Sequence, residues 1–240
     1  MNAYSTHSNR RLFRQGSLLV LALLLFGALA ATSDAEKPKN TRPTLPFGLN
    51  EESFLVPPDN PMTPEKIELG RVIFFDKRLS KDNTIACASC HIPALAFTDA
   101  QPVSAGVRHQ QGGRSAPAAI NRAFSKAQFW DGRADTLEAQ SIGPFTNPVE
   151  HGFDNYDEML KKVNAIGGYK KLFKQVFGTG ITIEGVGKAI ATFQRTLLSG
   201  NSPADRYDMG GEENAIPPSA QRGLVLFREK ARCTKCHSGF

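Results

Sequence analysis

The four cysteines of this chain fall into two copies of one pentapeptide, Cys-x-x-Cys-His, at residues 87–91 and 233–237. Two thiols at this spacing can add to the two vinyl groups of one haem, and the adjacent histidine then reaches the iron. A redox pair or a zinc site would explain one such pentapeptide, but two copies that use every cysteine indicate two covalently bound haem c groups. The predicted attachment sites are Cys87, Cys90, Cys233 and Cys236, and the predicted iron ligands are His91 and His237.

The first 30 residues have the pattern of a secretory signal peptide. Arg10, Arg11 and Arg14 precede an apolar run from 18 to 29, and Ala28-Leu29-Ala30 offers small residues to signal peptidase. The alternative is a retained membrane anchor, but this run is shorter than the roughly 20 residues that span a bilayer. We therefore predict a signal peptide over 1–30 and export to the periplasm.

The formal net charge of +6 does not indicate a nucleic-acid partner. Removal of the three signal arginines from the 29 basic residues leaves 26, against 23 acidic residues. The haem propionates would add negative charge, so the mature protein is expected to be near neutral.

The rest of the chain has helical patterning and no convincing alternating strand, which predicts a mostly α fold. Residues 31–62 are rich in Pro, Asn, Lys and Glu and are expected to form a linker and an N-terminal arm. Thr63-Pro64-Glu65 offers a capping hydroxyl and a proline at the first helical position, so a helix is expected from there. Gly70 would allow a neighbour to approach this helix closely. Further helices are predicted over 136–142, 156–163, 169–177 and 183–198.

Two stretches are expected to be irregular. Residues 85–121 contain several Pro and Gly residues, and a loop this long is unusual unless it wraps something such as a haem. Residues 201–218 are expected to form a polar connection.

A sequence repeat precedes the two pentapeptides. Leu69-Gly70-Arg71-Val72-Ile73-Phe74 leads to the first, and Arg222-Gly223-Leu224-Val225-Leu226-Phe227 leads to the second. The repeat predicts two related cytochrome c-like domains, an N-terminal one over 63–200 and a C-terminal one that begins at 201. Because the sequence stops at residue 240, three residues past His237, we expect the second domain, 201–240, to be truncated.

A series of spaced motifs lies between the two pentapeptides: Phe129-Trp130-Asp131-Gly132-Arg133, Leu137, Gln140, Gly143-Pro144 and Asn147-Pro148-Val149-Glu150. In order and spacing they closely resemble those of the bacterial dihaem cytochrome c peroxidases and the related MauG-type dihaem enzymes. The resemblance runs from about Leu45 to Phe240. It implies that the first haem is the site of peroxide reduction and that the second passes electrons to it.

The resemblance also implies roles for three side chains. Gln140 and Glu150 match the pair that lines the distal pocket of the first haem, and Trp130 matches the tryptophan between the two haems, a route for electrons. A carboxylate above the iron can take a proton from one oxygen of peroxide and return it to the other, while Gln140 positions the peroxide. Without the resemblance, Glu150 and Gln140 would be ordinary surface residues. Trp130, the single tryptophan, would suit a core.

Two further histidines, His109 and His151, and a candidate calcium ligand, Ser115, lie near these motifs in the sequence. Many family members hold a distal histidine on the first haem until reduction, but that position is Val107 here. His109, two residues further on, is expected to be an exposed loop residue, so the first haem would be open without activation. His151 follows Glu150 and is expected to neighbour the pocket. Family members bind calcium partly through an asparagine that is Ser115 here, so calcium would need carbonyl and water ligands.

These features predict a periplasmic cytochrome c peroxidase, an oxidoreductase that reduces hydrogen peroxide to water with electrons from a monohaem cytochrome c or a blue-copper protein. One alternative is a MauG-like oxidase that acts on a protein substrate. The distal ligand of the second haem separates these two, and it lies beyond residue 240. Another alternative is a dihaem electron carrier without a peroxide site, against which Gln140 and Glu150 argue. A homodimer is left open.

The first prediction concerns covalent haem. Mass spectrometry of the denatured mature protein should show the mass of two haems, because thioether bonds survive unfolding. Replacing Cys87 and Cys90 with Ala should remove one haem, and replacing Cys233 and Cys236 should remove the other. A wild-type protein that carries one haem or none after denaturation would contradict the assignment of both pentapeptides.

Overall fold

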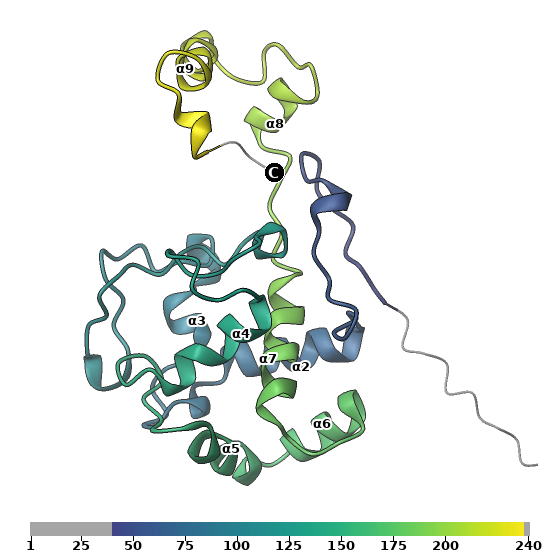
Figure 1. The fold of residues 1–240 in the computed structure, drawn as a ribbon, viewed down its shortest axis with the longest axis vertical. Helices are drawn as coiled ribbons and strands as arrows, with labels where there is room; N and C mark the ends of the chain where they lie inside the picture. The colour runs from purple at the N-terminus through teal and green to yellow at the C-terminus, as the bar shows by residue number, and fades with distance from the viewer. Residues whose placement is uncertain (1–39, 238–240) are drawn as a thin grey trace, which may run out of the picture. The chain divides into compact units, whose positions relative to one another are not determined.

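The computed structural model describes residues 40–237, and this part of the chain is helical (Figure 1). No β-strand forms within it, and β-type pairing there is limited to isolated bridges such as Ile92 with Thr98. The mostly α prediction is therefore confirmed. The predicted signal peptide and residues 31–39 of the linker lie outside the described residues. Within 40–237, none of the helices has the length and apolar character needed to span a bilayer.

The longer helices are α2 (Pro64–Phe75), α5 (Tyr156–Ala165), α6 (Tyr169–Phe177), α7 (Ile183–Gln194) and α9 (Pro218–Arg228). The shorter ones are α3 (Cys87–Cys90), α4 (Leu137–Ile142) and α8 (Pro203–Asp208). Single 3-10 turns occur at η1 (Glu51–Ser53), η2 (Lys77–Leu79), η3 (Pro93–Leu95), η4 (Val107–His109), η5 (Arg122–Phe124), η6 (Gly143–Thr146) and η7 (Cys233–Lys235). The helices predicted over 136–142, 156–163 and 169–177 correspond to α4, α5 and α6.

Helix α2 begins where the sequence predicts. The Thr63 hydroxyl accepts a hydrogen bond from the amide of Lys66 at 3.2 Å, and Pro64 occupies the first helical position. The helix buries Leu69, Ile73 and Phe74. It therefore presents one apolar face to the rest of the fold.

Helix α7 lies between α2 and α4 and touches both at glycines (Figure 1). A Cβ atom built on Gly70 of α2 would lie 2.0 Å from the carbonyl oxygen of Ala189. A Cβ built on Gly187 of α7 would lie 2.9 Å from the carbonyl oxygen of Glu138 in α4. Only a residue without a Cβ permits these distances. The close approach predicted for Gly70 is confirmed.

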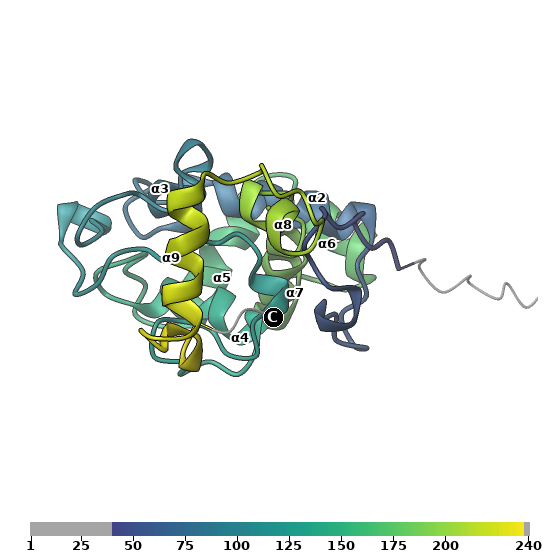
Figure 2. The same cartoon turned by 90° about the horizontal axis from the view of Figure 1, so that it is seen from above.

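Helix α6 lies beside α2 in both views (Figures 1 and 2). The hydroxyl of Tyr169, the first residue of α6, donates a hydrogen bond to Asp76 at the end of α2, at 2.9 Å. The buried rings of Tyr169 and Phe173 join the main core. This packing joins α6 to the core that also contains Leu69, Ile73 and Phe74 of α2.

Two predicted boundaries are wrong. Helix α7 ends at Gln194 and not at 198, because the carbonyl of Leu197 accepts from the amide of Asn121 at 2.8 Å and the chain leaves the helix. The predicted connection over 201–218 contains α8. The Ser202 hydroxyl accepts from the amide of Asp205, whose carboxylate accepts in return from the amide of Ser202, so a capping box starts this short helix.

The described part of the N-terminal arm packs against the domain. Phe54 and Met62 are buried with Ala123 and Phe124 in a second, smaller apolar cluster. The rings of Phe54 and Phe124 meet edge to face, with centroids 5.5 Å apart. The described part of the arm therefore contributes buried apolar contacts to the stability of the fold.

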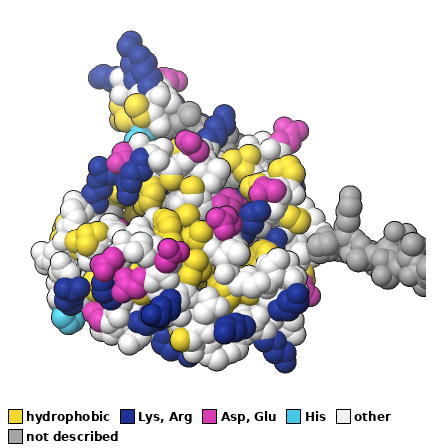
Figure 3. All heavy atoms as spheres, turned by 60° about the horizontal axis from the view of Figure 1, so that its bottom comes forward, with side chains coloured by type: hydrophobic (Ala, Val, Ile, Leu, Met, Phe, Trp, Pro, Cys, Tyr) yellow, Lys and Arg dark blue, Asp and Glu magenta, His cyan; other side chains and the backbone are white. Residues whose placement is uncertain are grey.

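One face of the molecule is drawn in Figure 3. Apolar side chains gather in its middle with several Asp and Glu side chains beside them, and Lys and Arg side chains predominate along its lower edge.

The sequence repeat is matched by local geometry. The ring of Phe74, at the end of α2, lies 6.3 Å from the ring of His91, and the ring of Phe227, at the end of α9, lies 6.2 Å from that of His237. In each pentapeptide the histidine amide donates to the carbonyl of the first cysteine at 2.9 Å. A helix with a phenylalanine as its penultimate residue thus precedes each pentapeptide, and that ring lies near the histidine of the pentapeptide.

The second prediction concerns the contact between α2 and α7. Gly70→Ala should destabilise the protein by about 1–3 kcal/mol, because the new methyl would overlap the Ala189 carbonyl and force the helices apart. Denaturant unfolding followed by circular dichroism measures this free energy. Gly113→Ala is the control, since a Cβ there meets no atom within 4 Å. Equal stability of the two variants would contradict the close packing.

Candidate functional site

Helix α3 brings the first pentapeptide into a compact turn. The Ser89 hydroxyl accepts from the amide of Ala86 at 3.0 Å, and this contact fixes the start of the turn. The side chains of Cys87, Cys90 and His91 then line one cavity, which we call the cysteine-side cavity. It is bounded by Phe74, Ile85, Ala86, Cys87, Cys90, His91, Gln140, Ser141, Pro144, Glu150, His151, Ile190 and Gln194.

The structure brings five of the predicted site residues together at this cavity. Cys87, Cys90 and His91 come from α3 and the residue after it, Gln140 comes from α4, and Glu150 follows η6. The remaining walls are mostly apolar. Two thiols and an imidazole therefore share an apolar cavity with an amide and a carboxyl group.

The orientation and the charge state of the His91 ring suit a metal ligand. The Nδ1 atom of His91 lies 2.9 Å from the carbonyl oxygen of Phe97, so that nitrogen carries the proton when the ring is neutral. Burial lowers the pKa of His91 and keeps the ring uncharged. A carbonyl that orients the imidazole in this way is the usual second partner of a metal-bound histidine.

The two thiols fit thioether formation better than binding a metal as thiolates. Burial raises the pKa of Cys87 to about 12 and also raises the pKa of Cys90, so both stay protonated in the apolar cavity. Neither forms a disulfide. Together with His91 and the apolar walls, they fit a haem bound through two thioether bonds and one imidazole.

Glu150 is a partly buried carboxyl group that can exchange a proton. Burial raises its pKa, while the positive charge of Arg133 and a hydrogen bond from Asn147 oppose that rise. The Asn147 amide donates to Glu150 Oε1 at 2.7 Å. This hydrogen bond fixes the direction of the carboxyl group and leaves Oε2 available.

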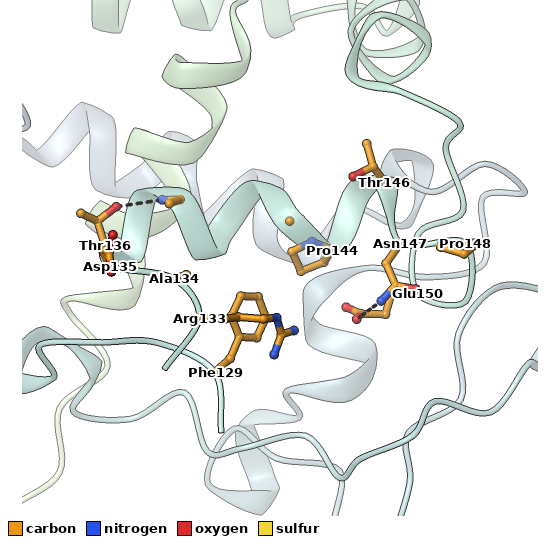
Figure 4. A pocket seen from close by; sticks show the side chains of 12 residues that line it. Phe129, Arg133, Ala134, Asp135, Thr136, Pro144, Thr146, Asn147, Pro148 and Glu150 are labelled. Atoms are coloured by element: carbon orange, nitrogen blue, oxygen red, sulfur yellow. Dashed lines mark hydrogen bonds between the residues drawn. The ribbon is translucent and has the colours of Figure 1, made fainter. Parts of the chain in front are cut away.

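A second cavity adjoins the first and shares Pro144 and Glu150 with it (Figure 4). This arginine-side cavity has a volume of about 820 Å³. Its lining residues are Phe129, Arg133, Ala134, Asp135, Thr136, Ala139, Gly143, Pro144, Thr146, Asn147, Pro148 and Glu150. Glu150 thus faces both an apolar space beside the cysteines and a more open polar space.

The structure adds residues that the sequence analysis did not assign. Gln194 donates to the hydroxyl of Ser141 at 3.0 Å, and both side chains are buried at the cysteine-side cavity. His151 lines the same cavity, as expected of a neighbour of the pocket. Its Nδ1 lies 2.8 Å from the Leu79 carbonyl, and burial lowers its pKa to about 4, so the ring is neutral. The sequence did not predict the hydrogen bond between Ser141 and Gln194, because these residues lie 53 positions apart and belong to no common motif.

Trp130 and His109 lie outside both cavities. Trp130 is 63% exposed, so the alternative of a core position is wrong; its indole Nε1 donates to the Ser115 carbonyl at 2.9 Å. His109 is exposed in η4, as expected for a loop residue. Val107 is buried and its amide donates to the Glu150 carbonyl at 3.1 Å. The loop before His109 therefore supports the turn that carries Glu150.

The second pentapeptide forms the turn η7, and neither Cys233 nor Cys236 is in a disulfide. His237 is exposed in the described part of the chain. No group of three or more His, Cys, Asp or Glu residues within 40–237 is arranged to hold a metal ion. Calcium therefore stays a prediction.

Comparison with known proteins gives consistent matches. The profile of the family described as di-haem cytochrome c peroxidase matches residues 64–214. Methylamine utilization protein MauG of Methylorubrum extorquens is 42% identical over 214 residues, which are 88% of this chain and 60% of that protein. Cytochrome c peroxidase Ccp of Escherichia coli is 37% identical over 196 residues, 82% of this chain and 42% of that protein.

Solved structures of similar proteins share the fold of this chain. A MauG-like protein associated with microbial copper homeostasis superposes with a TM-score of 0.68 at 33% identity, covering 85% of this chain and 57% of that one. The diheme peroxidase BthA from Burkholderia thailandensis superposes with a TM-score of 0.67 at 25% identity, covering 84% and 55%. The chain thus spans about 60% or less of the length of these relatives. Its two pentapeptides, its helical fold and the family profile over 64–214 show that the chain belongs to the di-haem cytochrome c peroxidase family.

Proposed function

We propose that this protein is a periplasmic dihaem cytochrome c peroxidase that reduces hydrogen peroxide to water. The observation that carries the proposal is the position of Glu150, whose carboxyl group lines the same cavity as Cys87, Cys90 and His91. A carrier of electrons has no need of a proton-exchanging group at this place. The haems would be covalently bound at Cys87 and Cys90 and at Cys233 and Cys236, with His91 and His237 as iron ligands.

Haem bound at the first pentapeptide would supply the iron centre and the electrons for O–O cleavage. The chain supplies the proton transfer. Glu150, deprotonated, accepts a proton from one oxygen of hydrogen peroxide and returns it to the other, which leaves as water. Because burial raises the pKa of Glu150, the group can both accept and return this proton. The Gln140 amide orients the peroxide by hydrogen bonding.

Electrons would enter through the second haem from a small soluble donor, a monohaem cytochrome c or a blue-copper protein. Trp130 would lie on the route to the first haem. Its indole is held by the hydrogen bond to the Ser115 carbonyl, so the ring has a defined direction although it is exposed. We also propose the domain division at 63–200 and 201–240, export by the signal peptide over 1–30, and calcium held by carbonyl and water ligands.

A MauG-like oxidase acting on a protein substrate is the second candidate. The 42% identity to the MauG protein of Methylorubrum extorquens favours it. Steady-state oxidation of a reduced monohaem cytochrome by peroxide would support the peroxidase. Slow cytochrome oxidation combined with peroxide-dependent oxidation of a protein substrate would support the MauG-like activity.

The third prediction tests Glu150. Glu150→Gln keeps the size and hydrogen bonding of the side chain but removes the base. Peroxide turnover by the haem-loaded protein should fall by roughly 10²–10⁴-fold, a typical contribution of general acid–base catalysis, or about 3–5 kcal/mol of barrier. In the wild type, kcat/KM for peroxide should fall as the pH drops through the raised pKa of Glu150, because the base is then protonated.

His109→Ala is the control for Glu150→Gln. It should leave haem content, the oxidised spectrum and turnover unchanged, since His109 is exposed and lines neither cavity. Wild-type turnover by Glu150→Gln would show that the proposed site is wrong. Loss of a bis-histidine spectrum in His109→Ala would contradict the open first haem but leave the peroxidase assignment standing.

A further inference from the structure

We infer that Arg133 is a positioning residue for the peroxide reaction: its guanidinium, fixed by Phe129 and Asp131, faces the cavity of Glu150 and favours the ionised form of that carboxyl group, which is the form that accepts a proton. The inference deepens the proposed function and rests on it. Arg133 belongs to the motif at 129–133, but neither the motif nor the haem-attachment sequences assigns it a role.

Arg133 is held in place on two sides. Its guanidinium carbon lies 3.5 Å from the ring centroid of Phe129, so the two planes are in cation–π contact. Its Nη1 donates to Asp131 Oδ1 at 2.8 Å. The other oxygen of Asp131 accepts from Arg114 Nη1 at 2.8 Å, and these two arginines hold the pKa of Asp131 far below its ordinary value. Asp131 therefore stays charged and anchors Arg133 although that side chain is half exposed.

The anchored guanidinium and the carboxyl group of Glu150 line the same cavity (Figure 4). Arg133 forms its ion pair with Asp131, and the hydrogen bond to Glu150 comes from the neutral amide of Asn147. A direct salt bridge would occupy the carboxylate oxygens and oppose their protonation strongly. A cation held nearby without such a bridge offsets the effect of burial and leaves an oxygen open to peroxide.

Other charged groups near Glu150 do not replace Arg133. Among the residues that line the two cavities, Arg133 is the only Lys or Arg. Asp135 adds a carboxylate to the arginine-side cavity. On the cysteine side, burial keeps His91 and His151 neutral, and the thiols of Cys87 and Cys90 are uncharged and would be thioethers in the haem-loaded protein. Without Arg133, the hydrogen bond from Asn147 would be the remaining interaction that favours the ionised carboxyl group, against the burial that favours the protonated one.

The fourth prediction compares three variants of the haem-loaded protein. Arg133→Gln removes the charge but can still bond Asp131, Arg133→Lys keeps the charge, and Arg114→Gln removes the other arginine on Asp131 without altering a residue that lines either cavity. The carboxyl stretch of Glu150 is followed by infrared pH titration, as the difference from the same sample carrying Glu150→Gln. The acid limb of kcat/KM for peroxide is measured in parallel.

In Arg133→Gln, the midpoint of the Glu150 titration and the acid limb should both move to higher pH by about one unit, a modest effect because Arg133 is partly solvated. Arg133→Lys should restore most of the wild-type midpoint, and Arg114→Gln should match the wild type. An unchanged midpoint in Arg133→Gln overturns the inference. A loss of haem content in Arg133→Gln would also overturn it, because the side chain would then serve to hold the haem.

The infrared result is independent of turnover. If Glu150→Gln reduces peroxide as fast as the wild type, the proposed function fails whatever the midpoint does. If turnover depends on Glu150 but the midpoint of the Glu150 titration does not change with the charge at position 133, only the proposed role of Arg133 is contradicted.

Discussion

Backbone contact between α7 and two other helices sets the geometry of the candidate site. Gly70 lets α2 approach the Ala189 carbonyl, and Gly187 lets α7 approach the Glu138 carbonyl in α4. Helix α2 leads toward α3, which carries Cys87, Cys90 and His91, while α4 carries Gln140. The distance between the walls of the cysteine-side cavity therefore depends on contacts that a single methyl group would disturb.

The chemistry of the site depends on how burial and charge are balanced. The cysteine-side cavity keeps His91 and the thiols neutral, which suits a haem iron ligand and thioether bonds. The same burial would leave Glu150 protonated if nothing opposed it. Arg133 supplies the opposing charge from a more open space, where it is held by Phe129 and Asp131. One carboxyl group can then serve as base and acid in turn.

The relatives of this chain include both MauG proteins and cytochrome c peroxidases, and the site described here suits either activity. The proposed roles of Glu150 and Gln140 concern peroxide at the first haem in either proposal, so they do not discriminate between the two activities. The chain spans about 60% or less of these relatives. Assignment of one activity therefore depends on the donor or substrate that delivers electrons, which is why the proposed test varies that partner.

The sequence by itself determined the two Cys-x-x-Cys-His pentapeptides, the helical class, the start of α2 at Thr63 and the repeat that leads to each pentapeptide, because these depend on local spacing and capping. Through the resemblance of spaced motifs it also predicted site roles for Gln140 and Glu150, and the structure places both residues at the cysteine-side cavity. It placed the end of α7 too late and missed α8, since a loop hydrogen bond to Asn121 and a local capping box decided those boundaries. Only the tertiary structure showed the exposure of Trp130 and the buried pair of Ser141 and Gln194. It also showed that Phe129 and Asp131 hold the Arg133 side chain in place. Those features depend on which segments fold against one another, and the spacing of residues along the chain does not contain that information.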